Sequence, residues 1–194
     1  MIRYTLLFII CYLIGSIPFS YLIGRYWAGV DIRRTGSGNV GATNVWRAAG
    51  KRAGILAFVC DFGKGALVVL LAGCFGGPPL IALSALAVLL GHSWPVFLGF
   101  RGGKMVATGV GVVVALSPLI GAIIAVIWLL TVFIARYVSL ASIITLAATP
   151  VLMLVFRMET PFILLGLFMA AFSVFKHFSN LKRLLSGTEP RIRI

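Results

Sequence analysis

Acidic residues are scarce in this 194-residue sequence, which has 4 Asp and Glu against 17 Lys and Arg and a formal net charge of +13. So few carboxylates argue against chemistry that needs several carboxylate metal ligands, and we expect no metal and no other cofactor. The 3 cysteines form no Cys-x-x-Cys or Cys/His metal spacing. We therefore expect Cys11, Cys60 and Cys74 to be buried in helices as small apolar residues.

Apolar residues are abundant: they make up 61% of the chain, charged residues only 11%, and the mean hydropathy is +1.11. A soluble domain of this size could not keep so much apolar surface from water. The sequence predicts an all-α integral membrane protein, a polytopic helical bundle forming one domain over residues 1–194, with its first apolar segment retained as an anchor. About seven transmembrane helices are expected, near 2–24, 54–75, 80–99, 105–118, 119–135, 138–156 and 160–176.

The segment 105–135 is the least regular of these. As one helix its 31 residues would extend about 46 Å, which exceeds a membrane core of ~30 Å. Ser117-Pro118 predicts a break into two spans or a re-entrant pair. With that break and an outside N-terminus, 14 of the 17 Lys and Arg lie on the inner side. This positive-inside bias predicts a cytoplasmic C-terminus and polar segments that face the cytoplasm.

The first polar segment on the inner side, residues 35–52, is rich in glycine, hydroxyl and amide residues. Glycines let backbone N–H groups converge on an oxyanion, and an arginine can bind phosphate through two donors. The alternative is a flexible basic loop against anionic lipid. The candidate residues here are Gly36, Ser37, Gly38, Asn39, Gly41, Thr43, Asn44 and Arg47.

The second segment contains Gly102, Gly103 and Lys104 before an apolar run that includes Thr108. Gly-Gly-Lys at the start of a helix would place backbone N–H groups, the positive end of the helix dipole and an ammonium together, which favours an anion. It is not a Walker A loop, because Leu98 and Met105 stand where Gly and Ser/Thr are required. A plain, positively charged turn is the alternative.

The third segment is the tail, where His177 and Asn180 would share a helix face. An interfacial amphipathic helix without a catalytic part is the alternative. Within the spans, we expect Asp61 and Lys64 to form an ion pair that orients the loops, although pairing alone would satisfy both. We expect His92 to be a hydrogen-bonded structural histidine near the outer end of a span or at a helix break.

Two arrangements used for acyl transfer are missing. No Ser-His-Asp set is evident, and His-x-x-x-x-Asp is absent because Phe97 and Lys182 follow His92 and His177 at that spacing. Any reaction would therefore use a substrate that already carries a good leaving group, such as an acyl phosphate. The three polar segments together offer many hydrogen-bond donors and cations and very few acids. Such a combination suits the binding of one or two phosphate-bearing substrates.

Four blocks resemble the bacterial membrane acyltransferases that move a fatty acyl chain from acyl phosphate to glycerol 3-phosphate. They are GSGNVGATNVWRAAGK (36–51), DFGKG (61–65), GHSWPVFLGFRGGKMVAT (91–108) and KHFSNLKRLLSGTE (176–189). The resemblance covers essentially the whole chain. One departure is Met105, where glycine is expected after Gly-Gly-Lys.

The resemblance implies formation of 1-acylglycerol 3-phosphate (lysophosphatidic acid) and phosphate, the first step of phospholipid synthesis. It implies that Ser37, Asn39, Thr43, Asn44 and Arg47 engage the phosphates and the reacting carbonyl. Gly102, Gly103 and Lys104 would bind glycerol 3-phosphate, His177 and Asn180 would lie at the reaction centre, and Glu189 would be structural.

The expected partners are acyl phosphate, glycerol 3-phosphate and the lipid bilayer, with no nucleic acid and no obligate protein partner. We expect the glycerol hydroxyl to attack the carbonyl directly, with either His177 or a substrate phosphate as the base. Lys104 and donors of the glycine-rich loop would stabilise the oxyanion and the departing phosphate. The alternatives are a transporter of anions or phosphate esters and a non-enzymatic lipid-binding protein. A transporter would continue polar residues across the bilayer, which the apolar segments 119–135 and 138–156 disfavour.

Overall fold

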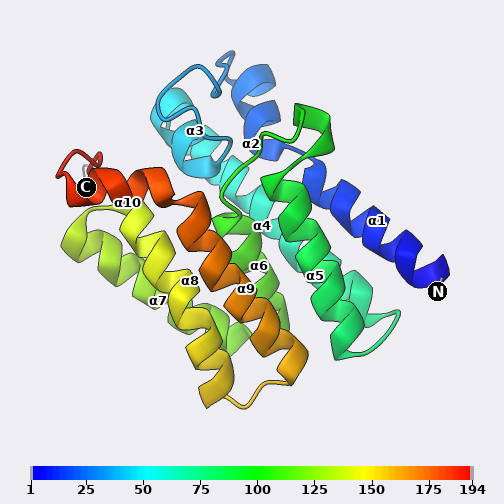
Figure 1. Ribbon diagram of the computed structural model, residues 1–194. Helices are drawn as coiled ribbons and strands as arrows, with labels where there is room; N and C mark the ends of the chain where they lie inside the picture. Colours follow the sequence, from blue (N-terminus) through cyan, green and yellow to red (C-terminus); the bar gives the residue numbers. More distant parts are fainter. Residues whose placement is uncertain (1, 193–194) are drawn as a thin grey trace. The chain divides into compact units, whose positions relative to one another are not determined.

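The structure is a computed structural model that describes residues 2–192, and in this part of the chain every regular element is a helix (Figure 1). The chain divides into two compact units, Met1–Leu116 and Ser117–Ile194, called here the N-terminal unit and the C-terminal unit. The all-helical prediction is confirmed for the described residues.

The N-terminal unit is built around α4, which contacts α3, α5 and α6, while α1 packs along α5. Its elements are α1 (Ile2–Ser16), α2 (Phe19–Leu22), η1 (Ile23–Trp27), α3 (Ala42–Ala49), α4 (Lys51–Gly73), α5 (Pro78–Ser93), η2 (Val96–Leu98) and α6 (Val106–Leu116). Glycines permit the close packing: a Cβ on Gly15 would collide with the Val88 backbone, and one on Gly65 with the Thr108 carbonyl. Small residues at such contacts are typical of membrane helices, where close van der Waals packing drives association.

Up to residue 192, where the described part of the chain ends, the C-terminal unit has four helices, among which α8 contacts α7 and α9, and α9 contacts α10. They are α7 (Pro118–Ala135), α8 (Val138–Val155), α9 (Thr160–Lys176) and α10 (Phe178–Leu185). The predicted break before α7 is confirmed. Pro118 occupies the first turn, and the Ser117 hydroxyl caps it by accepting from the backbone N–H of Ile120 at 3.4 Å. Proline suits this position because it has no N–H to leave unpaired.

Five segments within residues 2–192 are long and apolar enough to cross a membrane: Tyr4–Trp27, Lys51–Gly73, Pro78–Leu98, Pro118–Ala135 and Val138–Val155. A sixth is counted if α9 and α10, bent by 59°, form one broken span. α6 has 11 residues and extends only about 16 Å. The count of seven therefore stays a prediction.

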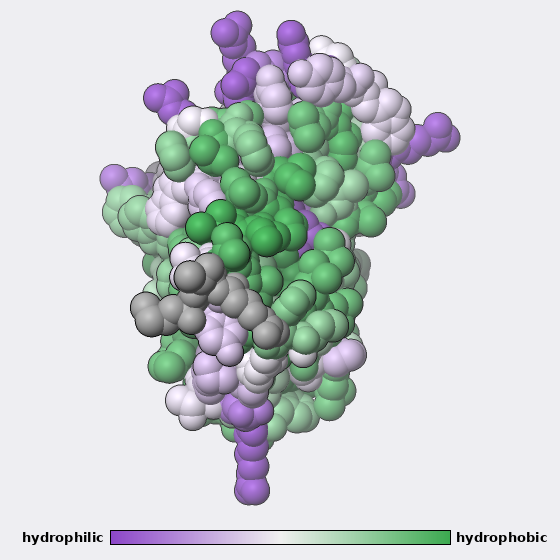
Figure 2. Space-filling model, turned by 90° about the vertical axis from the view of Figure 1, so that its right-hand side faces the viewer, coloured by the Kyte–Doolittle hydropathy of each residue, from purple (hydrophilic) through white to green (hydrophobic). Residues whose placement is uncertain are grey.

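Large apolar side chains cover the helix surfaces, among them Leu129, Phe133 and Ile134 of α7, as expected for helices that face lipid. Figure 2 shows one face of the molecule on which hydrophobic residues predominate. The cysteine prediction holds only for Cys11, since Cys60 is half-buried and Cys74 is exposed. A helix surrounded by lipid can present a cysteine outward without loss, so location in an apolar helix does not predict burial.

Candidate functional site

Gly36 and Gly38 give the glycine-rich loop between η1 and α3 its shape. Both adopt the left-handed backbone conformation, with φ of +63° and +69°, which an L side chain rarely adopts. Near Gly36 the loop also passes so close to Asn44 that a Cβ would collide with that side-chain oxygen. The loop is therefore a folded structure rather than a flexible linker, which the sequence had left open.

Asn44 organises this loop from the first turn of α3. Its side-chain nitrogen donates to the carbonyls of Ile32, Thr35 and Asn39 at 2.7, 3.0 and 3.1 Å, and its oxygen accepts from the N–H of Ser37 at 2.9 Å. The residue is only 2% exposed. Asn44 was predicted as a substrate donor; here its amide hydrogen-bonds with the loop backbone, and the substrate role stays a prediction.

The other polar groups of the loop and of α3 lie at the surface. Ser37, Thr43 and Arg47 are exposed, and Asn39 is half-buried. Thr43 and Arg47 are four residues apart on α3 and therefore share a face of the helix. Gly41, the residue before α3, provides no side-chain cap for its first turn. An exposed hydroxyl and guanidinium on one helix face can bind a phosphate.

The Gly-Gly-Lys segment lies before α6, separated from it by Met105. One part of the prediction is wrong: the backbone N–H of Gly103 donates to the carbonyl of His92 at 3.1 Å and does not point toward a ligand. A Cβ on Gly103 would also collide with the His92 ring and the Val40 carbonyl. This segment is therefore packed tightly between the end of α5 and the glycine-rich loop. Lys104 follows it and is half-buried.

Two residues near this turn are buried. Thr108 is fully buried in α6, and its carbonyl packs against Gly65 of α4. The expected contact of Thr108 with substrate stays a prediction. Met105 is fully buried and has a left-handed backbone with φ of +54°. That conformation gives a physical reason for glycine being expected at this position.

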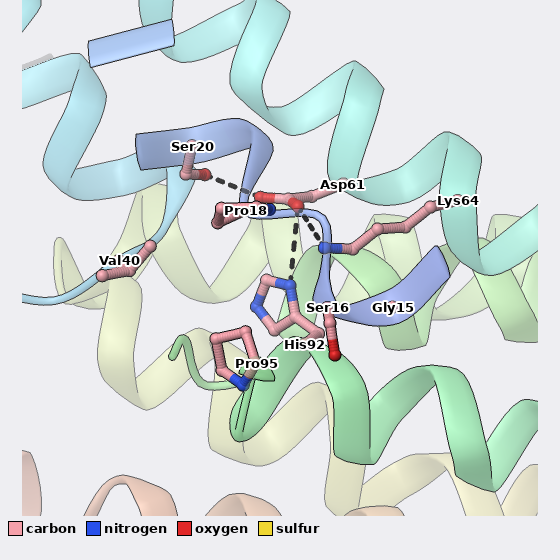
Figure 3. Close-up of a pocket in the computed structure, with 9 residues that line it drawn as sticks. All are labelled: Gly15, Ser16, Pro18, Ser20, Val40, Asp61, Lys64, His92 and Pro95. Atoms are coloured by element: carbon pink, nitrogen blue, oxygen red, sulfur yellow. Dashed lines mark hydrogen bonds and ion pairs between the residues drawn. The ribbon is translucent and has the colours of Figure 1, made fainter. Parts of the chain in front are cut away.

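A buried polar cluster lies inside the N-terminal unit (Figure 3). Lys64 Nζ lies 2.8 Å from Asp61 Oδ1, which confirms the predicted ion pair. Asp61 also accepts from the hydroxyl of Ser20 at 2.6 Å and lies 3.5 Å from His92 Nδ1. Sequence reasoning missed Ser20, because no local spacing links α2 to α4.

His92 lies at the end of α5, the helix break that the expectation named as one possibility, and it is bonded to Asp61 and Gly103. On which side of the membrane it lies stays a prediction. After His92 the chain reverses direction through Pro95 and η2 and returns to the end of α5. The apolar sequence of this stretch did not predict the reversal.

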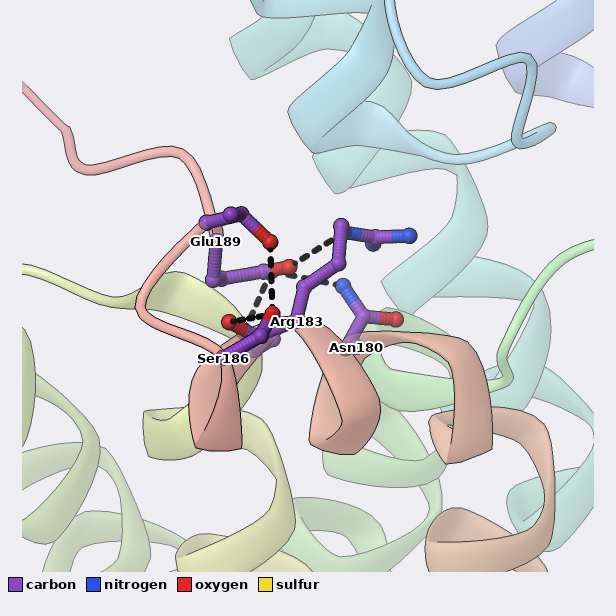
Figure 4. A network of polar contacts seen from close by, with 6 residues as sticks. Asn180, Arg183, Ser186 and Glu189 are labelled. Carbon is purple, nitrogen blue, oxygen red and sulfur yellow. Dashed lines mark hydrogen bonds and ion pairs between the residues drawn. The ribbon is translucent and has the colours of Figure 1, made fainter.

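In the C-terminal unit, Glu189 is the centre of a polar network (Figure 4). Its carboxylate accepts from Ser139 Oγ at 2.6 Å, Asn180 Nδ2 at 2.6 Å and Arg183 Nε at 2.8 Å. Burial raises the pKa of Glu189, but these hydrogen bonds and the Arg183 charge outweigh it and hold the pKa below its usual value. Sequence reasoning missed Ser139 and Arg183 as partners of Glu189.

His177 is buried at the junction of α9 and α10. Its Nδ1 lies 2.9 Å from the carbonyl oxygen of Ser173 and 3.4 Å from the Ser173 hydroxyl. A ring N–H that donates to a carbonyl fixes the tautomer with the proton on Nδ1. Nε2 of the neutral ring then carries the lone pair, which is the form needed for a general base.

Most acids are already paired with cations. Arg33 binds Asp31 through two nitrogens, at 3.0 and 2.7 Å, and its hydrogen bond lowers the pKa of Asp31 to about 2. Asp61 and Glu189 are paired with Lys64 and Arg183. Within the described residues no group of three or more His, Cys, Asp or Glu could hold a metal ion. Because these carboxylates are neutralised by cations, the protein suits substrates that carry the negative charge themselves.

Apolar helices joined by glycine-rich, cationic loops define the class as a helical integral membrane protein. The family model described as glycerol-3-phosphate acyltransferase matches residues 5–187. Over 195 residues the chain is 45% identical to a glycerol-3-phosphate acyltransferase of Desulforamulus reducens, covering 99% of this chain and 98% of the relative. A relative of that name from Clostridioides difficile is 42% identical, with 97% and 95% covered.

Two solved structures are also similar. The crystal structure of PlsY, an integral membrane glycerol 3-phosphate acyltransferase, in its glycerol 3-phosphate form is 41% identical, with a TM-score of 0.95 and 98% and 96% of the two chains covered. Its lysophosphatidic acid form is 40% identical, with a TM-score of 0.93 and the same coverage. This chain therefore belongs to the glycerol-3-phosphate acyltransferase family, and it is an acyltransferase.

Proposed function

We propose that this protein transfers a fatty acyl group from acyl phosphate to the 1-hydroxyl of glycerol 3-phosphate, as the first step of phospholipid synthesis. The hydroxyl oxygen forms an ester bond to the carbonyl carbon, and the bond from that carbon to the phosphate oxygen breaks. The products are 1-acylglycerol 3-phosphate and inorganic phosphate, and the hydroxyl proton passes to a base. The observation that carries the proposal is the likeness, over 98% of the chain, to PlsY in its glycerol 3-phosphate and lysophosphatidic acid forms.

The exposed groups of the glycine-rich loop and α3 provide the donors for phosphate and for the developing oxyanion. Ser37 and Arg47 contact the phosphate and the reacting carbonyl, and Asn39 and Thr43 provide further donors to the same groups. Asn44 holds the loop in its folded conformation. Gly102 and Lys104 bind glycerol 3-phosphate, with Gly103 holding the turn in shape. Preorganised donors of this kind stabilise charge that develops in the transition state.

His177 and Asn180 act at the reaction centre, and the hydrogen bond from Nδ1 to the Ser173 carbonyl supports His177 as the base. If His177 is the base, His177→Ala lowers kcat by roughly 10²–10⁴-fold. If a substrate phosphate takes the proton, the variant raises KM for glycerol 3-phosphate and leaves kcat nearly intact. Steady-state kinetics with each substrate varied in turn separates these two roles.

The membrane arrangement belongs to the same proposal. One acyltransferase domain over residues 1–194 has seven spans in a bacterial inner membrane, with the N-terminus outside and the loops and C-terminal tail in the cytoplasm. The acyl chain stays in the bilayer while glycerol 3-phosphate enters from the cytoplasm. No cofactor and no obligate protein partner is required. The excess of Lys and Arg in the inner segments supports this orientation.

The direct test uses purified protein in lipid or detergent with acyl phosphate and glycerol 3-phosphate. We expect lysophosphatidic acid and inorganic phosphate to form in equal amounts. Replacing acyl phosphate with acyl-CoA or acyl carrier protein should give no product. Failure to form lysophosphatidic acid, together with uptake of glycerol 3-phosphate into proteoliposomes, would favour a transporter instead.

A further inference from the structure

The buried cluster of Ser20, Asp61, Lys64 and His92 has no part in the reaction proposed above. It joins three stretches far apart in the sequence: α2, the middle of α4 and the end of α5 (Figure 3). The ammonium of Lys64 also donates to the carbonyl of Ile17 at 2.9 Å. Charged groups at membrane depth are expensive unless paired, so each member restricts the positions of the others.

His92 is the member that reaches the loops. Its carbonyl accepts from the N–H of Gly103, and its ring lies where a Cβ on Gly103 would be. The carbonyl of Val40, from the glycine-rich loop, contacts the same point of Gly103. His92 therefore lies behind the Gly-Gly-Lys turn at the place where that turn meets the glycine-rich loop.

Asp61 holds the ring in this place. With Nδ1 of His92 directed at the carboxylate of Asp61, 3.5 Å away, the opposite edge of the ring faces Gly103. Asp61 is in turn fixed by Lys64 and Ser20, at 2.8 and 2.6 Å. A buried side chain whose partners are all fixed forms a rigid support for the backbone packed against it.

We propose that His92 is a positioning residue that sets the place of the Gly-Gly-Lys turn against the glycine-rich loop, and so the affinity for glycerol 3-phosphate. The inference rests on the proposed function, in which that turn binds glycerol 3-phosphate. Displacing the turn weakens binding at one loop and leaves the groups that act on acyl phosphate in place. His92 does not touch the reacting atoms in this arrangement.

The test is a kinetic comparison of His92→Ala and His92→Gln in the purified full-length protein. We expect His92→Ala to raise KM for glycerol 3-phosphate by about tenfold, with kcat changed by less than about threefold and KM for acyl phosphate unchanged. The glutamine amide can still donate to Asp61 and fill the space beside Gly103. His92→Gln should therefore bring KM back to within about threefold of the original value.

Ser84→Ala is the matched control, because Ser84 is equally buried in α5 but lies away from both loops. It should leave both KM values unchanged. An active His92→Ala protein with an unaltered KM for glycerol 3-phosphate would overturn the proposal. So would equal losses for both substrates that glutamine does not rescue, since these indicate only a general loss of structure.

A further variant tests the inference if His92→Ala does not fold. Gly103→Ala displaces the turn from the other side, so it should raise KM for glycerol 3-phosphate with the imidazole of His92 intact. An unchanged KM for glycerol 3-phosphate in Gly103→Ala overturns the inference. Lys104→Ala tests the proposed function separately. If wild-type activity is present but Lys104→Ala leaves KM unchanged, the assignment of glycerol 3-phosphate to this turn is wrong, whatever His92 does.

Discussion

Asn44 makes four hydrogen bonds with the backbone of the loop that precedes it, and no charged group takes part in them. Its side-chain amide therefore replaces the regular secondary structure that the glycine-rich loop does not form by itself. An amide is the side chain that suits this position, because it offers two donors and an acceptor together.

Replacing Asn44 should unfold the loop without touching an exposed substrate donor. Asn44→Ala leaves three carbonyls and one N–H without their partner, which destabilises the protein by about 2–4 kcal/mol. Asn44→Asp should be at least as harmful, because a carboxylate would face those carbonyls. Thermal unfolding in detergent should show Tm lower by roughly 5–10 °C, while the exposed Arg52→Ala serves as a control with an unchanged Tm.

Met105 provides a test of backbone strain. Met105→Ala removes a fully buried side chain and keeps a left-handed residue, so we expect a loss of about 2–5 kcal/mol. Met105→Gly loses the same side chain but relieves about 1 kcal/mol of strain. In thermal unfolding, the Met105→Gly protein should therefore have a higher Tm than the Met105→Ala protein, and both should have a lower Tm than the protein with Met105. Equal stability of the two variants would contradict a left-handed backbone at 105.

Local chemistry explains which site residues could be predicted. The Asp61–Lys64 pair was predictable because residues three apart meet on a helix. The burial of Asn44 and the bond between Gly103 and His92 were not, because each depends on how a loop returns to a distant part of the chain. Amide and glycine residues suit both ligand binding and loop folding, so their identity alone cannot decide between the two.

At the scale of elements, the C-terminal tail is fastened to the start of α8. Glu189 accepts from Ser139, the N–H of Ile192 donates to the carbonyl of Arg136 at 2.9 Å, and Arg191 donates to the hydroxyl of Tyr137 at 3.0 Å. The amphipathic tail helix was predictable from its leucine spacing. Its attachment was not, because the partners lie some 50 residues away.

The lowered pKa of Glu189 predicts a pH dependence. A carboxylate whose folded pKa lies below its unfolded value of about 4.3 contributes stability above that pH, and this contribution disappears as the pH falls through the folded pKa. Glu189→Gln should lower Tm at pH 7. The difference in Tm from wild type should shrink as the pH is lowered below about 4. A constant difference across this range would exclude the ionised carboxylate as the source of stability.

For the whole molecule, the break at Ser117-Pro118 separates α6 from α7, and the predicted number of spans and orientation depend on it. The break was predictable because proline acts locally, through its missing N–H and its fixed φ. The number of spans was less predictable, because α6 has 11 residues and α9 is bent against α10 by 59°. Length and hydropathy alone do not settle how such helices cross a bilayer.

Orientation can be measured with a membrane-impermeant maleimide on intact spheroplasts, after the native cysteines are replaced. Seven spans with an outside N-terminus predict labelling of Arg157→Cys from outside and of Ser186→Cys only after the membrane is opened. Both positions are exposed in the structure. External labelling of Ser186→Cys would rule out the cytoplasmic tail.

The uncharged bonds of Asn44 have a consequence for behaviour in salt. Ions screen interactions between exposed charges, and the Debye length falls from about 10 Å at 0.1 M to about 3 Å at 1 M. Hydrogen bonds between the buried, uncharged amide of Asn44 and backbone carbonyls are little affected by such screening. Rising ionic strength should therefore weaken the attraction of Arg47 and Lys104 for phosphate, while the glycine-rich loop keeps its folded structure. Enzyme activity that is lost in high salt should then return in full when the salt is diluted.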